Sequence, residues 1–310
     1  RDCQQPGAVE GAVEQMARPC IAVGGSRAQD TRRACSTAYE QLLARLDGAR
    51  PSLIVVGHTN THDAEQCCKL INALSGDVPM IGCTSCRGVV VNDNWLSDRA
   101  QEHALALWAI SDPDGAFTTL HVAYKKLDGA MAELEAQVTR AISQHNGTPP
   151  SFVVLLGSPG GEERILSVLS GAVGENVPIL GGSSGDNHVG TGECTGEWRQ
   201  MARPSSPSSA GAPAAVSSDG VSVALGWSSC DVASHLSSPH LETEHTGVVT
   251  AVRDERTLLT IDGDRATDWL LRRSPALSAA AAAAVAAVTI AAATLSLTSP
   301  PLAIAAATLA

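Results

Sequence analysis

Two short segments of the sequence concentrate side chains that could do chemistry. The first, residues 82–88, reads Gly-Cys-Thr-Ser-Cys-Arg-Gly and contains a Cys-x-x-Cys pair. Two cysteines at this spacing can form a redox disulfide or supply half of a tetrahedral zinc site. Such a zinc site needs two further ligands, and Cys67 and Cys68 are adjacent on a predicted helix, where neighbours point about 100° apart. We therefore expect no metal site at Cys83 and Cys86, and no redox activity either, because an internal repeat has Gly182 and Gly185 in their places.

The second segment, residues 181–188, is the counterpart of the first in an internal repeat. Gly181 follows Gly82 by 99 residues, and Pro178 follows Pro79 by the same number. Glycine replaces both cysteines in this copy, so the shared chemistry is glycine backbone together with serine and threonine hydroxyls. We expect these groups to bind a small ligand. The candidate ligand-binding residues in the two segments are Gly82, Cys83, Thr84, Ser85, Gly181, Gly182, Ser183, Ser184, Asp186 and Asn187.

His58 is a further candidate, because it comes directly after the first predicted strand of the repeat. Together with Cys83 it could form a nucleophile and base pair, which would make the chain a thiol enzyme. The second copy carries Ser158 and Gly182 at these places, and no third residue that would orient the imidazole is identifiable. We therefore predict that His58 contacts a ligand and that the chain has no catalytic residues. A thiol enzyme using Cys83 is kept as an alternative.

The secondary structure predicted around these segments places both at one edge of a sheet. The first copy predicts a helix, a strand, a helix and a strand at residues 31–46, 53–57, 63–75 and 78–82. The second copy repeats this order at residues 131–143, 152–157, 162–172 and 177–181. Open α/β sheets bind ligands beyond the carboxyl ends of their parallel strands, where free N–H groups can hold a carboxylate or phosphate. We therefore expect the two segments to be loops that lie close together at that edge.

The repeat defines the expected fold class and domain organisation. We predict an α/β fold of internally duplicated β-α-β half-domains with mixed sheets, related by a pseudo-two-fold axis. The half-domains span about residues 20–125 and 126–272 of one sensory domain, after an N-terminal flank at 1–19. Residues 203–218, rich in Pro, Ser, Ala and Gly, are expected to be a flexible insertion. Further strands are expected at residues 103–110, 119–123, 220–226, 232–236, 247–252 and 257–261.

The last part of the chain, residues 273–310, changes character. Residues 274–310 carry no charged side chain, and most positions are Ala, Leu, Val, Ile, Thr or Ser. The stretch 276–297 has the roughly 20 residues needed to cross a bilayer, although alanine is only weakly apolar and Pro300 ends the run. We expect a disordered tail, with a membrane anchor as the alternative.

Composition limits the partners and the cellular setting. The formal net charge is −11, and an acidic chain without a basic stripe is a poor nucleic-acid binder, because phosphate neutralisation needs clustered Lys and Arg. Nine cysteines at irregular spacing, with no secretory signal at the start of the chain, favour reduced thiols in the cytoplasm. We expect no cofactor and no nucleic acid, and contact with a membrane only through the tail.

Several short segments, taken in order, are similar to a known family. They are residues 51–56, 78–84, 177–187, 219–225, 247–250 and 261–266. This combination resembles the N-terminal domain of the FIST (F-box and intracellular signal transduction) family over residues 20–270. The resemblance implies a sensory module that binds small ligands such as amino acids and is attached to signalling or ubiquitin-ligase modules. No F-box, kinase or receiver segment is recognisable, and the family's companion domain is expected to follow near Ala266.

Three functions therefore compete. The favoured one is a small-ligand-binding sensory domain of a signal-transduction protein, which senses amino acids or small carboxylates and works with a signalling or ubiquitin-ligase partner. The alternatives are an adaptor of the F-box ubiquitin-ligase type and the thiol enzyme. The sequence favours the first, because the duplicated segments share backbone and hydroxyl groups rather than a catalytic set.

Overall fold

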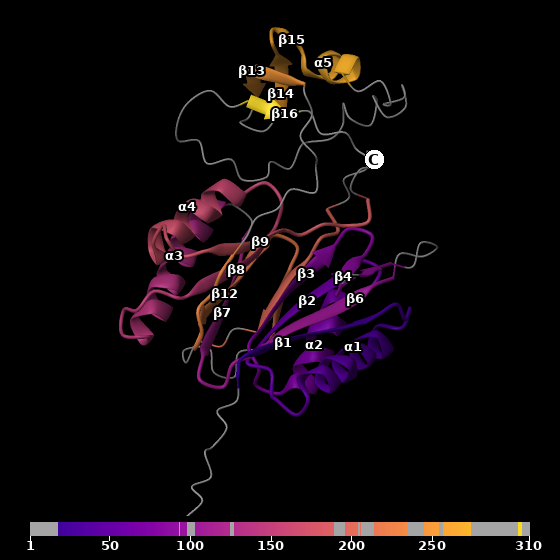
Figure 1. Ribbon diagram of the computed structural model, residues 1–310, viewed down its shortest axis with the longest axis vertical. Helices are drawn as coiled ribbons and strands as arrows, with labels where there is room; N and C mark the ends of the chain where they lie inside the picture. Colours follow the sequence, from indigo (N-terminus) through magenta and orange to yellow (C-terminus); the bar gives the residue numbers. More distant parts are fainter. Residues whose placement is uncertain are drawn as a thin grey trace, which may run out of the picture.

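The body of the protein consists of two mixed β-sheets, each covered on one side by a pair of helices (Figure 1). The computed structural model describes residues 18–92, 94–97, 103–124, 127–188, 196–203, 205, 214–234, 245–253, 257–273 and 303–305. This mixed α/β architecture confirms the fold class predicted from the sequence.

The first sheet contains six strands in the order β1-β6-β2-β3-β10-β11. Strands β2 and β3 are parallel, and every other neighbouring pair in this sheet is antiparallel. In this spatial order the strands are β1 (Cys20–Ser26), β6 (Leu105–Ser111), β2 (Leu53–Thr59), β3 (Met80–Ser85), β10 (Gln200–Arg203) and β11 (Ala215–Ser217). Two strands from late in the chain thus complete the sheet that the N-terminal part begins.

Two helices, α1 (Thr31–Leu46) and α2 (Ala64–Ser75), cover the outer face of the first sheet. Both begin where the sequence predicts, because an aspartate caps each first turn. The Asp30 carboxylate accepts from the Arg33 amide and the Asp63 carboxylate from the Gln66 amide, each at 2.7 Å. The apolar stripe at spacing four along α1 is buried as expected, and it comprises Ala34, Ala38, Leu42 and Leu46.

The second sheet repeats this plan with four strands in the order β7-β12-β8-β9. The strands are β7 (Ala116–Ala123), β12 (Gly220–Trp227), β8 (Phe152–Gly157) and β9 (Ile179–Ser183). Strands β8 and β9 are parallel and the other two pairs antiparallel, as in the first four positions of the first sheet. Helices α3 (Leu127–Gln144) and α4 (Glu162–Val173) cover its outer face. The shared plan is consistent with an internal duplication.

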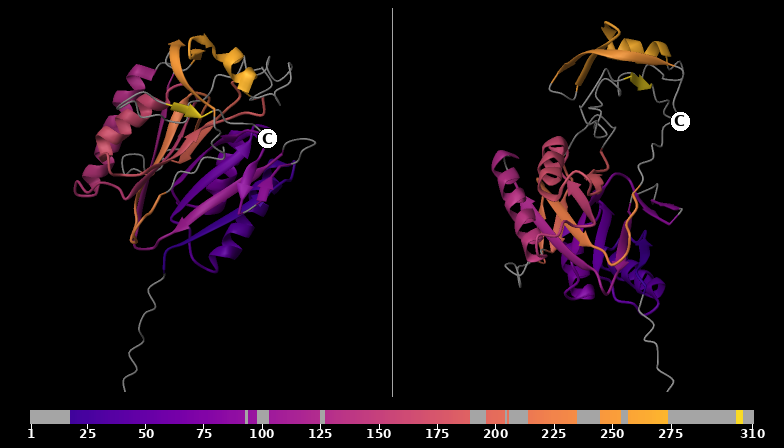
Figure 2. Two further views of the ribbon diagram at one scale, coloured as in Figure 1. Left: turned by 45° about the horizontal axis from the view of Figure 1, so that its top comes forward. Right: turned by 60° about the vertical axis from the view of Figure 1, so that its left-hand side comes forward.

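The two sheets pack face to face, so the body has four layers in the order helix, sheet, sheet, helix (Figures 1 and 2). A small apolar cluster fills the space between the sheets. Its buried members are Leu53, Ile81, Phe152, Val154, Ala202 and Ala224. Strand β10 also contacts β7 and β12 across this space, so the first sheet is tied to the second through a strand from late in the chain.

The structure corrects several expectations about the elements. Residues 82–85 and 181–183 lie in β3 and β9 rather than in loops. Strand β7, expected in the first half-domain, pairs with β12 in the second sheet. Strand β1 was not predicted, and the described residues of the expected strand 232–236 have no strand structure. The ends of the expected insertion 203–218 belong to β10 and β11, and most of the rest lies outside the described residues.

Smaller elements complete the described structure. A hairpin of β4 (Val89–Val91) and β5 (Asn94–Leu96) follows β3, and near the C-terminus β13 (Thr246–Arg253) and β14 (Thr257–Ile261) form the predicted hairpin. The remaining elements are β15 (Asp264–Arg265), α5 (Ala266–Arg273) and β16 (Ala303–Ala305). The expected Ala-rich tail, like the flank 1–19, lies almost wholly outside the described residues. Within the described part of the chain, no helix has the length and apolar character that crossing a bilayer requires.

Candidate functional site

A pocket of about 560 Å³ opens at the carboxyl ends of the parallel strands β2 and β3. This is the edge at which the sequence predicts ligand binding. The β2–α2 connection, the first turn of α2, the end of β3 and the segments around β10 and β11 build its wall. The lining residues are Asn60, His62, Asp63, Ala64, Glu65, Thr84, Glu197, Arg199, Val216, Ser217 and Ser218.

The first turn of α2 contributes the positive end of a helix dipole to the pocket. Residues Asp63, Ala64 and Glu65 line the wall, and the first backbone N–H groups of a helix have no partner within the helix. The side chain of Asp63 accepts from one of these groups, the Gln66 amide. A negatively charged group is therefore favoured here, as at other helix N-termini.

Two buried polar atoms of the lining residues have no hydrogen-bond partner within the described structure. These atoms are His62 Nε2 and Ser217 Oγ. The side chain of His62 is only 3% exposed, and its Nδ1 lies 3.2 Å from Thr31 Oγ1. A buried polar group without a partner costs about 1–3 kcal/mol, so both atoms favour a polar group that would complete their hydrogen bonding.

Hydrogen bonds between Arg199 and Thr84 join the residues just before β10 to the end of β3. The Arg199 amide donates to Thr84 Oγ1 at 2.9 Å, and the Thr84 amide donates to the Arg199 carbonyl at 2.9 Å. The guanidinium of Arg199 donates to the carbonyl oxygens of Trp198 at 2.7 Å and Gly196 at 3.4 Å. Backbone pairing thus holds a cationic side chain at the pocket wall.

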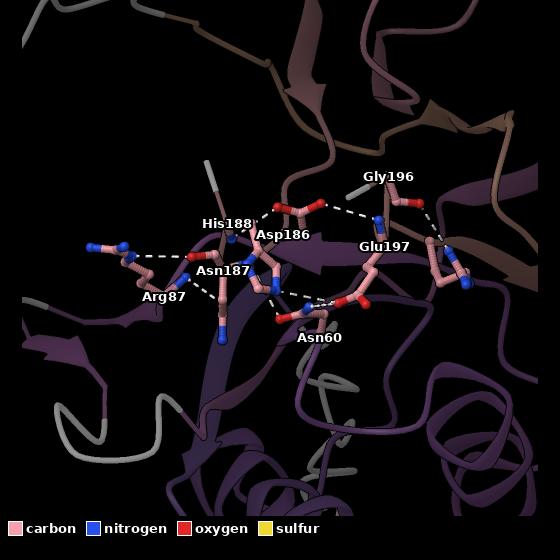
Figure 3. Close-up of polar contacts among 8 residues, drawn as sticks. Asn60, Arg87, Asp186, Asn187, His188, Gly196 and Glu197 are labelled. Carbon is pink, nitrogen blue, oxygen red and sulfur yellow. Dashed lines mark hydrogen bonds and ion pairs between the residues drawn. The ribbon is translucent and has the colours of Figure 1, made fainter. Parts of the chain in front are cut away.

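A polar network surrounds Glu197 at the rim of the pocket (Figure 3). The Asn60 side-chain amide donates to the Glu197 carboxylate at 2.7 Å, and the Asn187 amide donates to Asn60 Oδ1 at 3.3 Å. The carboxylate of Asp186, which is almost fully buried, accepts from the amides of His188 at 3.0 Å and Glu197 at 3.1 Å. Asp186 therefore shapes the backbone beside the pocket.

The two segments singled out from the sequence lie against each other, as expected. The Gly185 amide donates to the Thr84 carbonyl at 3.0 Å, and the Arg87 amide donates to Asn187 Oδ1 at 2.8 Å. Arg87 Nε also donates to the Asn187 carbonyl at 3.2 Å. Of the eleven predicted residues, however, Thr84 alone lines the pocket.

Two of the residues predicted to bind a ligand, Ser184 and His58, are buried and do not line the pocket. The amide group of Gln200, which is fully buried in β10, lies 3.0 Å from Ser158 Oγ and 2.6 Å from Ser184 Oγ. Ser184 Oγ also donates to the Gly157 carbonyl at 2.9 Å. His58 is completely buried inside β2, where its Nδ1 lies 2.8 Å from the Thr59 carbonyl oxygen.

The thiol of Cys83 has the wrong ionisation for a nucleophile at neutral pH. Burial raises its pKa to about 12, although a hydrogen bond with Ser184 acts in the opposite direction. The thiolate is the nucleophilic form of cysteine, and it is scarce this far below the pKa. Among the described residues, moreover, no group of three or more His, Cys, Asp or Glu side chains could hold a metal ion.

The corresponding edge of the second sheet is occupied by its own side chains. The carboxylate of Glu162, at the start of α4, accepts from the Gly160 amide at 2.9 Å and from the Ser183 hydroxyl. The exposed residues Gly181, Gly182 and Ser183 lie in β9 rather than at the pocket. The site is thus built by the first copy of the repeat and by a late segment of the chain, not by the two copies equally.

Sequence reasoning missed most of the pocket residues. Asn60 and His62 follow β2 directly, so their place at a strand end could have been inferred from the sequence. Glu197, Arg199 and Ser217 come from the chain after the second copy, and nothing local predicts that β10 pairs with β3. No motif marks these three residues.

Comparison with known proteins assigns the family. The model of the FIST N domain matches residues 52–264, which is more than half of the chain and contains all the pocket residues. None of the curated proteins compared with the chain matches it. FIST domains are associated with signal transduction. The matched range also contains most strands of both sheets, and the chain belongs to the FIST N domain family.

Proposed function

We propose that this chain is the small-ligand-binding sensory domain of a signal-transduction protein, and that its ligand occupies the pocket at the ends of β2 and β3. The observation that carries the proposal is a pocket whose buried His62 Nε2 and Ser217 Oγ have no partner in the described structure. Its location beyond the carboxyl ends of parallel strands is the usual ligand position in α/β sheets.

The charges around the pocket favour an amino acid or another small carboxylate. Arg199 and the first turn of α2 attract a carboxylate group. Asp63, Glu65 and Glu197 supply negative charge that would attract an ammonium group. A ligand that carries both groups satisfies both sides of the pocket, so amino acids are expected to bind more tightly than small carboxylates that lack an ammonium group.

Binding rather than catalysis is the proposed activity, because the protonated thiol of Cys83 disfavours the thiol enzyme. The proposed setting is the cytoplasm, where the seven cysteines of the described residues, which form no disulfide, would stay reduced. A signalling or ubiquitin-ligase partner would read out the bound state.

A thermal-shift screen with the proteinogenic amino acids, acetate and succinate tests the proposal. A ligand at about 100 Kd is expected to stabilise the fold by about 2.7 kcal/mol, because it binds only the folded chain. For a chain of this size the midpoint should rise by about 5–10 °C. Arg199→Gln should remove most of the shift.

Arg50→Gln is the matched control, because Arg50 lines a separate cavity of about 390 Å³ between the carboxyl ends of α1 and α2. The same ligand should stabilise this variant and the unaltered chain equally. The proposal fails if no compound of the screen stabilises the protein, or if Arg199→Gln keeps the full shift.

A further inference from the structure

Three histidines lie in contact beneath the pocket. The ring centroid of His62 is 6.5 Å from that of His58 and 5.4 Å from that of His103. Each ring has one buried nitrogen without a partner in the described structure, namely His58 Nε2, His62 Nε2 and His103 Nδ1. Only His62 also lines the pocket, so this cluster joins the pocket wall to the core behind it.

The surroundings of His62 disfavour a proton on its ring. The ring lies at the N-terminal ends of both α1 and α2, because its Nδ1 contacts Thr31 Oγ1 and Asp63 directly follows it. Both helix dipoles present their positive ends there. The facing carboxylates are Asp30, which precedes α1, and Asp63, which precedes α2, and both are engaged in capping their helices.

The ionisation of these rings agrees with the geometry. Burial lowers the pKa of His62 to about 4, repulsion from His58 and His103 adds to this effect, and Asp30 opposes it. Burial also lowers the pKa of His58, against the hydrogen bond to Thr59 and the charge of Asp63. The histidines His58 and His62 are therefore neutral at neutral pH.

We propose that His58, His62 and His103 form a proton-sensitive support of the pocket, which loosens the β2–α2 connection when the medium is acidified. This proposal depends on the proposed function in one respect, namely that the ligand binds in the pocket. In neutral medium the His62 ring contacts Thr31 in the first turn of α1, packs against the rings of His58 and His103, and keeps the pocket wall in place. In acid, a protonated His62 is repelled by both helix ends and by a protonated His58, so the connection at residues 60–63 opens and bound ligand is released.

The direction of the effect follows from proton linkage. In an opened connection His62 recovers its ordinary pKa of 6.5, whereas in the closed one the pKa is about 4. The open form therefore binds more protons between these two values, and its population grows as the pH falls through that window. From about pH 7 to about pH 5, His62 alone increases the opening equilibrium about 20-fold.

Amide hydrogen exchange of the full chain, without any ligand, tests this proposal. Exchange of residues 60–70 is measured at about pH 7 and about pH 5 and corrected for the intrinsic pH dependence of exchange. The unaltered chain should show an increase in opening of about 20-fold at the lower pH. His62→Gln should reduce the increase to a small remainder, because glutamine does not titrate.

His121→Gln is the matched control. His121 is buried in β7, its Nδ1 lies 2.9 Å from Ser222 Oγ, and burial lowers its pKa to about 4 as well. This variant should keep the acid-dependent opening of residues 60–70. If His62→Gln does not fold, as judged by its thermal transition, His103→Gln replaces it, with a smaller but measurable reduction expected, because it removes part of the repulsion that lowers the pKa of His62.

Equal corrected exchange of the unaltered chain at both pH values would overturn the proposal. So would an unchanged acid response in the folded His62 or His103 variant, or loss of the response in His121→Gln. Because no ligand is added, a negative ligand screen leaves this result interpretable, and failure of the two proposals can be told apart.

Discussion

At the scale of single residues, buried polar side chains hold the two halves of the body together. Asp112, directly after β6, is almost fully buried, and its carboxylate accepts from the Ser229 hydroxyl at 2.6 Å and from the Ser229 amide at 2.9 Å. It also accepts from Ser228 Oγ at 3.0 Å. Both serines follow β12, so one carboxylate ties the end of a strand in the first sheet to the end of a strand in the second.

Asp112→Asn should lower the free energy of unfolding by about 1–3 kcal/mol at neutral pH, because an amide nitrogen cannot accept these hydrogen bonds. Burial raises the pKa of Asp112, but the hydrogen bonds, those of Ser229 first, outweigh it and hold the pKa below the ordinary 3.8. The carboxylate therefore stabilises the fold above that value, and its contribution is lost as the pH falls through the folded pKa. Urea unfolding at several pH values measures both effects.

Asp114→Asn provides the comparison, since Asp114 lies in the same turn and is exposed. It should change the free energy of unfolding by less than about 0.5 kcal/mol. Equal losses of unfolding free energy in the two variants would show that the negative charge of the turn, and not the buried hydrogen bonds of Asp112, stabilises the contact between the ends of β6 and β12.

At the scale of elements, the packing of α1 on β1 depends on a glycine. A Cβ atom at Gly24 would lie 1.9 Å from the Ala38 carbonyl oxygen and 2.8 Å from the Leu42 amide nitrogen. The backbone of the helix thus rests directly on the strand. Gly24, one of the two glycines that weaken the strand signal of residues 20–26, permits this close approach.

Gly24→Ala should cost about 3 kcal/mol or more, because the added methyl group meets helix backbone that cannot move aside locally. Gly57→Ala, a glycine of β2 in the same sheet, should stay within about 1 kcal/mol, since its Cβ would meet only Val89 Cγ1 at an ordinary 3.6 Å. Chemical denaturation of both variants measures the difference. Comparable stability of the two would contradict the proposed tight contact of α1 and β1.

At the scale of the whole molecule, stability depends on the apolar layer between the sheets. Phe152 is 5% exposed, its ring centroid lies 6.3 Å from that of Phe117, and the ring covers Gly226 of β12. Aromatic residues are scarce in this chain, which has two phenylalanines, and the structure places both at this one interface. Truncation of Phe152 therefore removes contacts with both Phe117 and Gly226.

Phe152→Ala should destabilise the protein by about 3–5 kcal/mol, because it leaves a cavity between two sheets whose strands cannot collapse into it. Leu43→Ala, at a residue of α1 that is 39% exposed, should cost less than about 1 kcal/mol. Calorimetry of both variants measures the losses and shows whether the two sheets unfold in one transition. A loss near zero for Phe152→Ala would mean that the sheets are stable without their shared layer.

The sequence by itself determined the elements whose signals are local. Helix α1 follows from its apolar spacing, α2 from the cap at Asp63, and β8 from a continuous apolar run, because each signal lies within a few residues of the element. The repeat predicted the matching order of strands and helices in both copies and the contact between residues 82–88 and 181–188. The family resemblance rests partly on the same segments and partly on residues 219–225, 247–250 and 261–266.

Only the tertiary structure decided where the site lies. The pairing of β10 with β3 brings Arg199 and Glu197 to residues more than a hundred positions earlier in the chain, and no local pattern encodes such a pairing. Burial in the sheets, in turn, removed His58 from the pocket wall and raised the pKa of Cys83. Periodicity and capping act between near neighbours, whereas strand partners and desolvation depend on the packing of the whole body.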